Sequence, residues 1–309
     1  MTTERSSKAG EITYRIEACD GPRFSPQRIH RLSHNFNEHP LLQLPELARL
    51  AKDLYPMGQC RFIAPGSTQA SEFWHEPKDA SGRDVDEVFR RIEEPGSWVA
   101  LYNVETQPRY RELLRQVIDC VRPMVEPEQP GIFNAGGFIF ISAPPSVTPF
   151  HIDRENNFWL QIKGRKTMNV WDPSDRLVVS SEDRARFIVS RRLTGVRLKD
   201  EFVERSNEFF VGSGDGVYFP STSPHMTRCD AGSTRAGDAV SVSIGVVFYT
   251  DLTRMHANIH ACNLFLRRFG ITPSEPGDGG KMDIIKFRLG RALVYLRQRL
   301  RSYTPSVGM

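Results

Sequence analysis

Residues 147–173, VTPFHIDRENNFWLQIKGRKTMNVWDP, form the stretch of the 309-residue chain that says most about its fold. Alternate residues of a β-strand share a face, so His151 and Asp153 are predicted to project together. Phe150 and Ile152 should then pack in the opposite direction. Two side chains that can bind a metal ion therefore converge without backbone strain.

A hairpin is predicted in the rest of this stretch. β-Forming residues occupy positions 157–163 and 166–171 and are separated by a turn at 164–165. On the second strand, Lys166 shares a face with apolar side chains. Burying an ammonium group there is costly unless an anion meets it. The lysine therefore predicts an acidic ligand inside a barrel.

Residues 212–228, GSGDGVYFPSTSPHMTR, supply a third metal ligand. A glycine-rich turn precedes a short strand at 217–219, and the proline that follows leaves His225 in or beside the start of the next strand. His225 with His151 and Asp153 gives two histidines and one carboxylate, which is the facial triad of non-haem Fe(II) oxygenases. Such a triad leaves coordination positions open for chemistry.

These motifs resemble those of the JmjC and cupin-like Fe(II)/2-oxoglutarate-dependent oxygenases. Within that family they are most similar to the asparaginyl hydroxylase that inhibits the hypoxia-inducible factor. The resemblance covers about residues 131–250, is strongest at 147–173 and returns at 214–225. The matching positions in its strongest part are Thr148, His151, Asp153, Asn157, Phe158, Gln161, Ile162, Lys163, Gly164 and Lys166.

The expected fold is mainly β with α decoration. It is a double-stranded β-helix, a jelly-roll and cupin-like barrel, wrapped by N-terminal and C-terminal helices. Three regions are predicted: an N-terminal α/β flank at 1–130, a barrel core at 131–250 and a C-terminal helical region at 251–309. Helical spacing and capping signals predict helices at 44–54, 84–93 and 109–121, and a strand is predicted at 98–104.

The resemblance implies roles for residues around the iron ligands. Lys166 and Thr148 would hold the distal carboxylate of 2-oxoglutarate, and Asn157 would lie near the other end of this cosubstrate. The family also places a polar residue for the cosubstrate on an earlier strand. Tyr102 and Asn103 both fit that position, and the sequence does not choose between them.

The activity that the resemblance implies is hydroxylation of a C–H bond, with release of succinate and CO₂. A protein side chain is the expected substrate, with a small molecule or RNA as alternatives. Phe158, Trp159 and Trp171 are expected to line the site and exclude water. Two other classes stay open. One is a metal-dependent cupin of another reaction type, in which Lys166→Ala should barely change activity, and the other is a non-catalytic JmjC-like regulatory or binding protein.

A basic amphipathic helix is predicted at residues 281–301, which contain seven basic residues and one acid. Its apolar positions at helical spacing are Ile285, Leu289, Ala292, Leu293, Leu296 and Leu300. The pattern favours a helix docked on the barrel or on a second subunit over contact with nucleic acid. The family resemblance adds homodimerisation through C-terminal helices.

Two further histidines, His256 and His260, are spaced i, i+4 on a predicted helix. Two histidines alone fall short of a zinc ligand set, and the residue after the first is alanine rather than the glutamate of a metalloprotease. A structural role is therefore favoured for both.

The composition limits the classes of protein to which the chain can belong. The formal net charge is +4, and 39% apolar residues support a sizeable core. Five cysteines, an odd number without a CxxC pair, favour reduced thiols in the cytoplasm over a disulfide framework. The N-terminus has no apolar signal core, and no segment reaches the roughly 18 apolar residues of a membrane helix. A cytoplasmic protein without membrane contact is predicted.

Overall fold

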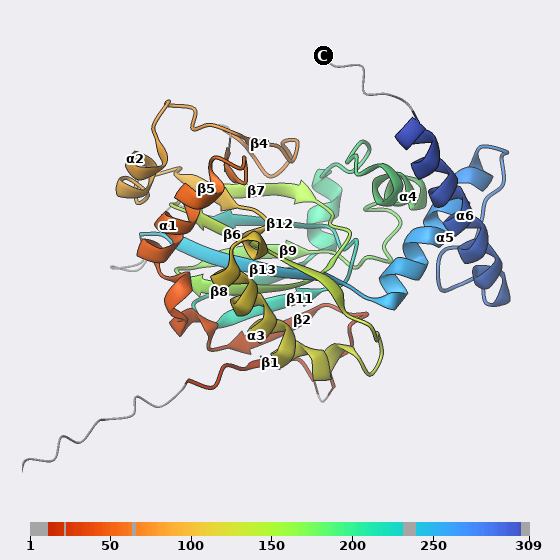
Figure 1. The fold of residues 1–309 in the computed structure, drawn as a ribbon, viewed down its shortest axis with the longest axis horizontal. Coiled ribbons are helices and arrows are strands. Elements are labelled where there is room, and N and C mark those ends of the chain that lie inside the picture. Colours follow the sequence, from red (N-terminus) through yellow and green to blue (C-terminus); the bar gives the residue numbers. More distant parts are fainter. Residues whose placement is uncertain (1–11, 22, 64–65, 231–238, 304–309) are drawn as a thin grey trace, which may run out of the picture.

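Two antiparallel sheets face each other in the computed structural model, which describes residues 12–21, 23–63, 66–230 and 239–303 (Figure 1). In spatial order, the larger sheet consists of β1 (Ile16–Ala18), β2 (His30–His34), β11 (Asp215–Phe219), β8 (Asn156–Lys163), β13 (Ser241–Tyr249), β6 (Phe133–Ser142), β5 (Trp98–Leu101), β3 (Cys60–Ile63) and β4 (His75–Glu76). The smaller sheet consists of β10 (Asn207–Val211), β9 (Lys166–Val170), β12 (His225–Cys229) and β7 (Ser146–His151). The helices are α1 (Leu44–Leu54), α2 (Val85–Arg90), α3 (Pro108–Val125), α4 (Ser181–Ser190), α5 (Asp251–Arg267) and α6 (Lys281–Tyr303).

The strand order is that of a jelly roll. Four central strands of the larger sheet, β6, β13, β8 and β11, stand opposite the whole of the smaller sheet. Strands that are adjacent in the sequence repeatedly lie in different sheets, which is how a jelly roll closes its core. The expected mainly β barrel with helical decoration is confirmed. The region before residue 130 does more than flank this barrel, because it adds five strands to the larger sheet.

The hairpin predicted for residues 157–171 is wrong, because its two strands belong to different sheets. β8 pairs with β11 and β13, so both of its edges are already occupied. β9 pairs instead with β10 and β12. The chain crosses between the sheets at Gly164, which has a φ of +68°, and a Cβ there would meet the carbonyl oxygen of Val240 at 2.6 Å.

Helices α1 and α3 cover the outer face of the larger sheet, and their apolar side chains form the main core with it (Figure 1). All three predicted N-terminal helices are confirmed, and Asp84 caps α2 by accepting a 2.8 Å hydrogen bond from the backbone N–H of Glu87. The strand predicted at 98–104 ends at Leu101. Asn103 has a φ of +51°, which turns the chain away from the sheet.

The segment between β9 and β10, which includes α4, packs on the outer face of the smaller sheet. This packing corrects the expected lining of the site. Trp171 lies in this outer cluster, where its Nε1 donates to the carbonyl oxygen of Phe202. Phe158 faces the opposite outer core, and Trp159 alone of the three lies between the sheets, beside Met168. Alternation along β8 sends neighbouring aromatic residues to opposite faces.

Helices α5 and α6 cross and pack against each other, and α4 packs on α5 (Figure 1). The buried positions of α6 are Asp283, Lys286 and Gly290, whereas Leu289 and Leu296 of the predicted apolar stripe are more than half exposed. Docking of this stripe on the barrel is therefore wrong, and docking on a second subunit stays a prediction. The side chain of Leu300, like the N-terminal residues before position 12, lies outside the described residues.

Two sequence-based expectations concern the cysteines and membrane-spanning segments. All five cysteines are unpaired. In the described part of the chain, no helix combines the length and the apolar content that crossing a lipid bilayer requires.

Candidate metal centre

Strand pairing brings the two predicted histidine ligands together. His151, the last residue of β7, stands opposite His225, the first residue of β12, and their ring centroids lie 4.1 Å apart. Asp153 follows β7, and its Oδ2 is 3.5 Å from Nε2 of His225. One ligand atom from each of the three residues lies within 4.8 Å of the others. Bonds of about 2.1 Å place the three facial ligands of one ion roughly 3 Å apart. The three ligand atoms would therefore need to move only slightly inward to bind one ion.

A β-bulge sets the orientation of β7. Between the His151–His225 pair and the Thr148–Thr227 pair, β7 contains one residue more than β12. Pro149, which has no N–H to donate to the ladder, lies in this bulge. Thr148 and His151 therefore both face the barrel interior, although they are three residues apart.

Hydrogen bonds fix the tautomers of both histidines. Nδ1 of His151 lies 2.7 Å from the carbonyl oxygen of Pro149, and Nδ1 of His225 lies 3.0 Å from that of Ser223. A carbonyl oxygen only accepts, so each Nδ1 carries the proton and donates it. Each Nε2 is left with a lone pair directed at the position between the three residues, as a metal ligand requires. The donor set thus fits a divalent ion.

Burial controls the charges of this cluster. It lowers the pKa of His225 to about 4 and that of His151 well below its usual value, so both imidazoles are neutral at pH 7. The close approach of His225 to Asp153 is therefore not a salt bridge at that pH. Burial, with a smaller contribution from Glu155, raises the pKa of Asp153 to about 7. A carboxylate with this pKa is stabilised by any cation that binds beside it.

Lys166 begins β9 and is buried inside the barrel, with 4% of its surface exposed. No carboxylate forms an ion pair with it among the described residues, and burial lowers the pKa of its ammonium group. Thr148 lies on the same interior face, with β12 between the two strands, because Thr227 pairs with both Thr148 and Met168. A buried cation without an internal partner and a nearby hydroxyl are suited to an incoming carboxylate.

The structure separates the two polar residues that the sequence left open. Tyr102 is half-buried beside the metal-ligand cluster, where desolvation and then the charge of Asp153 raise its pKa. Its hydroxyl lies 2.5 Å from Nδ1 of His75. Asn103 is exposed, and its positive φ turns the chain outward. Asn157 is buried on β8 next to Gly245, and its amide lies 3.2–3.3 Å from the position that a Cβ would take there.

Sequence reasoning missed an aromatic wall beside the ligands. The ring of Phe73 stacks on the His151 imidazole, with centroids 3.8 Å apart and planes within 15°. His75, two residues further on, packs against Trp98 at 4.4 Å. Trp74 between them is 64% exposed. The alternation in Phe73-Trp74-His75 is a strand signal that the sequence contained, but its neighbours in the fold could not be read from it.

The other histidine pair forms no comparable site. His260 is buried between helices, and its pKa falls to about 3 because of burial and then the charge of Arg184. Within the described ranges, the grouping of ligand atoms that could hold a metal ion is that of His151, Asp153 and His225, and it does not include His256 or His260. The structural role favoured for them stays a prediction.

Comparison with known proteins identifies the class. Residues 132–252 match the JmjC domain, almost the range over which the motifs resemble that family. The barrel core of the chain therefore contains a JmjC domain. The closer likeness to the asparaginyl hydroxylase stays a prediction, and none of the curated proteins matches the chain.

Solved structures that match include the ribosomal oxygenase YcfD of Escherichia coli, at 17% identity and a TM-score of 0.48, over 90% of this chain and 67% of that one. YcfD in complex with cobalt and 2-oxoglutarate matches at 17% identity and a TM-score of 0.47, over 87% and 64%. Its complex with cobalt and succinic acid matches at 18% and 0.45, over 87% and 64%. This chain spans about two thirds of the length of these structures.

Proposed function

We propose that this protein is an Fe(II)- and 2-oxoglutarate-dependent dioxygenase that hydroxylates a C–H bond and releases succinate and CO₂. The observation that carries the proposal is the convergence of His151, Asp153 and His225 in the same barrel as Lys166, a buried cation without a carboxylate partner in the described residues. A metal site and a carboxylate site side by side are what a 2-oxo acid cosubstrate needs. The JmjC match over 132–252 supports the same class.

Each side chain has a defined task in this proposal. His151, Asp153 and His225 hold the iron. Lys166 and Thr148 bind the far carboxylate of 2-oxoglutarate and so orient its keto acid end toward the metal. When bound, the iron and the cosubstrate together supply the oxidant. The chain itself contributes position and exclusion of water.

Two residues complete the cosubstrate site. Asn157 is the proposed neighbour of the keto acid end. Tyr102, rather than the exposed Asn103, is the proposed polar residue from the earlier strand, and its bond to His75 fixes the direction of its hydroxyl. Trp159 closes the interior on the side of Met168.

A protein side chain is the proposed substrate, in a cytoplasmic protein that forms a homodimer. The apolar side chains that α6 exposes at spacings of three, four and seven residues are Met282, Ile285, Leu289 and Leu296. A seam with this spacing is typical of a helix that pairs with another helix. A second copy of the chain is therefore the proposed partner of α6.

The test is succinate release from 2-oxoglutarate by the purified protein, with and without Fe(II), in wild type, His225→Ala and the control His256→Ala. Succinate production should need both Fe(II) and 2-oxoglutarate, fail in His225→Ala and persist in the control. Full activity in Lys166→Ala would instead indicate a cupin with another metal-dependent reaction. Absence of metal binding by the folded wild type would indicate a non-catalytic protein.

A further inference from the structure

The outer edge of β7 borders a cleft that the proposed reaction does not use. β7 is the last strand of the smaller sheet and pairs with β12 on one side. On its other side, the N–H of Phe150 donates to the carbonyl oxygen of Gln69 at 2.9 Å. A cleft of about 630 Å³ opens beside Ser146 and Val147, where the strand begins. Its volume lies within the range of ligand sites.

The edge is open to the cleft at Ser146 and Val147, and the same strand ends at the metal ligand His151. An edge strand presents backbone N–H and C=O groups with which another extended chain can pair. From Ser146 to His151 the strand covers about 16 Å, at about 3.3 Å per residue. A polypeptide that pairs with β7 at Ser146 and Val147 would therefore lie within about 16 Å of the metal ligands, and the Phe150–Gln69 bond ends the open part of the edge before His151.

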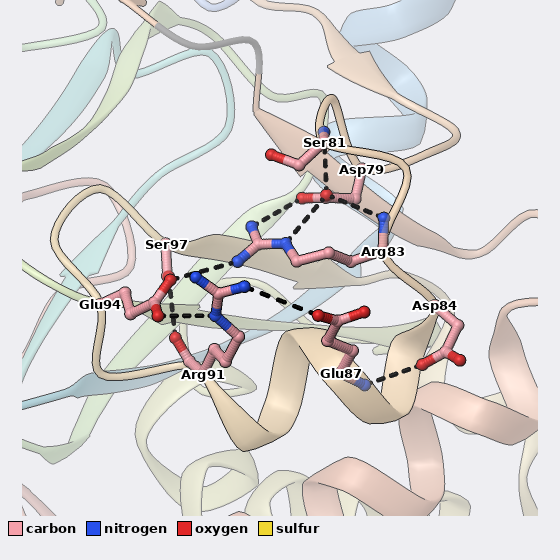
Figure 2. Close-up of polar contacts among 8 residues, drawn as sticks. All are labelled: Asp79, Ser81, Arg83, Asp84, Glu87, Arg91, Glu94 and Ser97. Carbon is pink, nitrogen blue, oxygen red and sulfur yellow. Dashed lines mark hydrogen bonds and ion pairs between the residues drawn. The ribbon is translucent and has the colours of Figure 1, made fainter.

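The opposite wall of the cleft comes from α2 and the loops around it, and it is charged. Figure 2 shows that Arg83 binds both carboxylate oxygens of Asp79, through Nε at 3.1 Å and Nη2 at 3.0 Å. Arg91 donates from Nε to Glu94 at 2.6 Å and lies 3.6 Å from Glu87 (Figure 2). Three carboxylates thus face two guanidinium groups, and the wall has surplus negative charge.

One carboxylate of this wall, that of Glu87, can still accept a hydrogen bond from outside the cleft. The contact of Glu87 with Arg91 is too long for a hydrogen bond, and the Glu87 side chain is 39% exposed. Glu94, by contrast, accepts from Arg91 and lies 3.5 Å from Nη1 of Arg83. A basic group from outside would therefore be bound best by Glu87. The same surplus charge disfavours the phosphate backbone of a nucleic acid.

We propose that this cleft docks an extended, basic stretch of the polypeptide substrate, which pairs with the outer edge of β7 and places a lysine or arginine at Glu87. The inference rests on the proposed function, whose substrate class it narrows to proteins with a basic segment beside the modified residue. Backbone pairing supplies the direction toward His151. The charge at Glu87 supplies the selection between basic and acidic segments.

Docking can be measured without turnover. Fluorescence anisotropy would follow two labelled ten-residue peptides, one of alternating lysine and threonine and one of alternating glutamate and threonine, binding to wild type, Glu87→Lys and the control Glu93→Lys. Glu93 is exposed and lies outside the cleft. The lysine peptide should bind wild type and the control, and Glu87→Lys should weaken it roughly fivefold or more. Hydrogen exchange of the Ser146–Thr148 amides should slow when that peptide is bound.

Equal binding of the two peptides, equal binding by Glu87→Lys and wild type, or unchanged exchange at Ser146–Thr148 would each overturn the docking proposal. His151→Ala separates docking from the proposed function. It should abolish iron binding and leave binding of the lysine peptide intact. If wild type binds the peptide but no iron, the docking surface stands and the proposed dioxygenase activity fails.

Discussion

Two clusters of buried and half-buried polar residues in this chain contain two histidines, one aspartate and one lysine each. They are His151, Asp153, His225 and Lys166 in the barrel, and His256, His260, Asp283 and Lys286 on α5 and α6. In the helical cluster, Lys286 lies 2.9 Å from Asp283 and donates to the carbonyl oxygen of Ser274 at 2.8 Å. In the barrel cluster, Lys166 has no such partner among the described residues, and three ligand atoms point at one position. Buried polar residues therefore indicate a binding site when their charges are left uncompensated, and a structural role when they are paired.

The largest expected difference between the clusters is in metal affinity. His151→Ala removes a ligand atom and should weaken Fe(II) or Co(II) binding by more than about 100-fold, since loss of even outer-shell partners costs 10–100-fold. His260→Ala, in the helical cluster, should leave metal affinity unchanged. Isothermal titration under anaerobic conditions measures both. Similar losses in the two variants would contradict the distinction.

Removal of each lysine should act in opposite ways on stability. Lys286→Met leaves the buried Asp283 carboxylate without its ion-pair partner, with hydrogen bonds from the backbone N–H groups of Gly277 and Gly279, and should reduce the free energy of unfolding by about 3 kcal/mol. Lys166→Met removes an uncompensated cation and should leave stability equal or higher, while 2-oxoglutarate affinity falls roughly 100-fold. Urea unfolding and 2-oxoglutarate titration measure the two quantities. A large stability loss in Lys166→Met would show that this lysine has an internal partner.

The two aspartates should respond differently to pH. Burial raises the pKa of Asp153 to about 7, whereas the hydrogen bond from Lys286 and those from neighbouring backbone N–H groups outweigh burial and lower that of Asp283. Metal binding at pH 6 should therefore release a proton from Asp153, and metal affinity should rise from pH 5.5 to pH 7.5. In the metal-free protein, the stabilising contribution of protonated Asp153 is complete below pH 3.8 and is lost as pH rises through 7. Titration calorimetry in two buffers with different ionisation enthalpies detects the proton, and Asp153→Asn should release none.

The smallest expected effect concerns the exposed face of α6. Leu289→Glu places a charge in the apolar seam and should shift the dimer toward monomer, with little change in metal binding. Gln298→Glu, an exposed position on the same helix outside the seam, is the matched control. Sedimentation velocity measures the oligomeric state. A wild type that is monomeric at high concentration would contradict the proposed homodimer.

The sequence predicted which three side chains converge, because two of them are close in the chain. His151 and Asp153 are two residues apart, and the strand start at His225 follows from the local proline and turn signals. The fold class followed from the same motifs. Lys166 was assigned to the interior from the apolar residues that share its face, and it lies there.

The errors share one physical cause: strand pairing and the face on which a side chain lies depend on residues that are distant in the sequence. The sequence of β8 and β9 is typical of a hairpin. No residue near them in the sequence indicates that β11 and β13 occupy both edges of β8. Phe158 and Trp171 were placed in the site because an aromatic residue in a strand suits either face. The sequence left Tyr102 and Asn103 open because the backbone turn that exposes Asn103 depends on the neighbouring strands.

The most direct test of the central claim is an anaerobic titration of the metal-free protein with Fe(II) and then 2-oxoglutarate, followed by visible absorption. Wild type should develop the charge-transfer band of a 2-oxo acid chelated to Fe(II), with one iron and one 2-oxoglutarate per chain. His151→Ala should develop no band, and Lys166→Met should develop it only at much higher 2-oxoglutarate concentrations. A folded wild-type protein that binds neither iron nor 2-oxoglutarate would contradict the account.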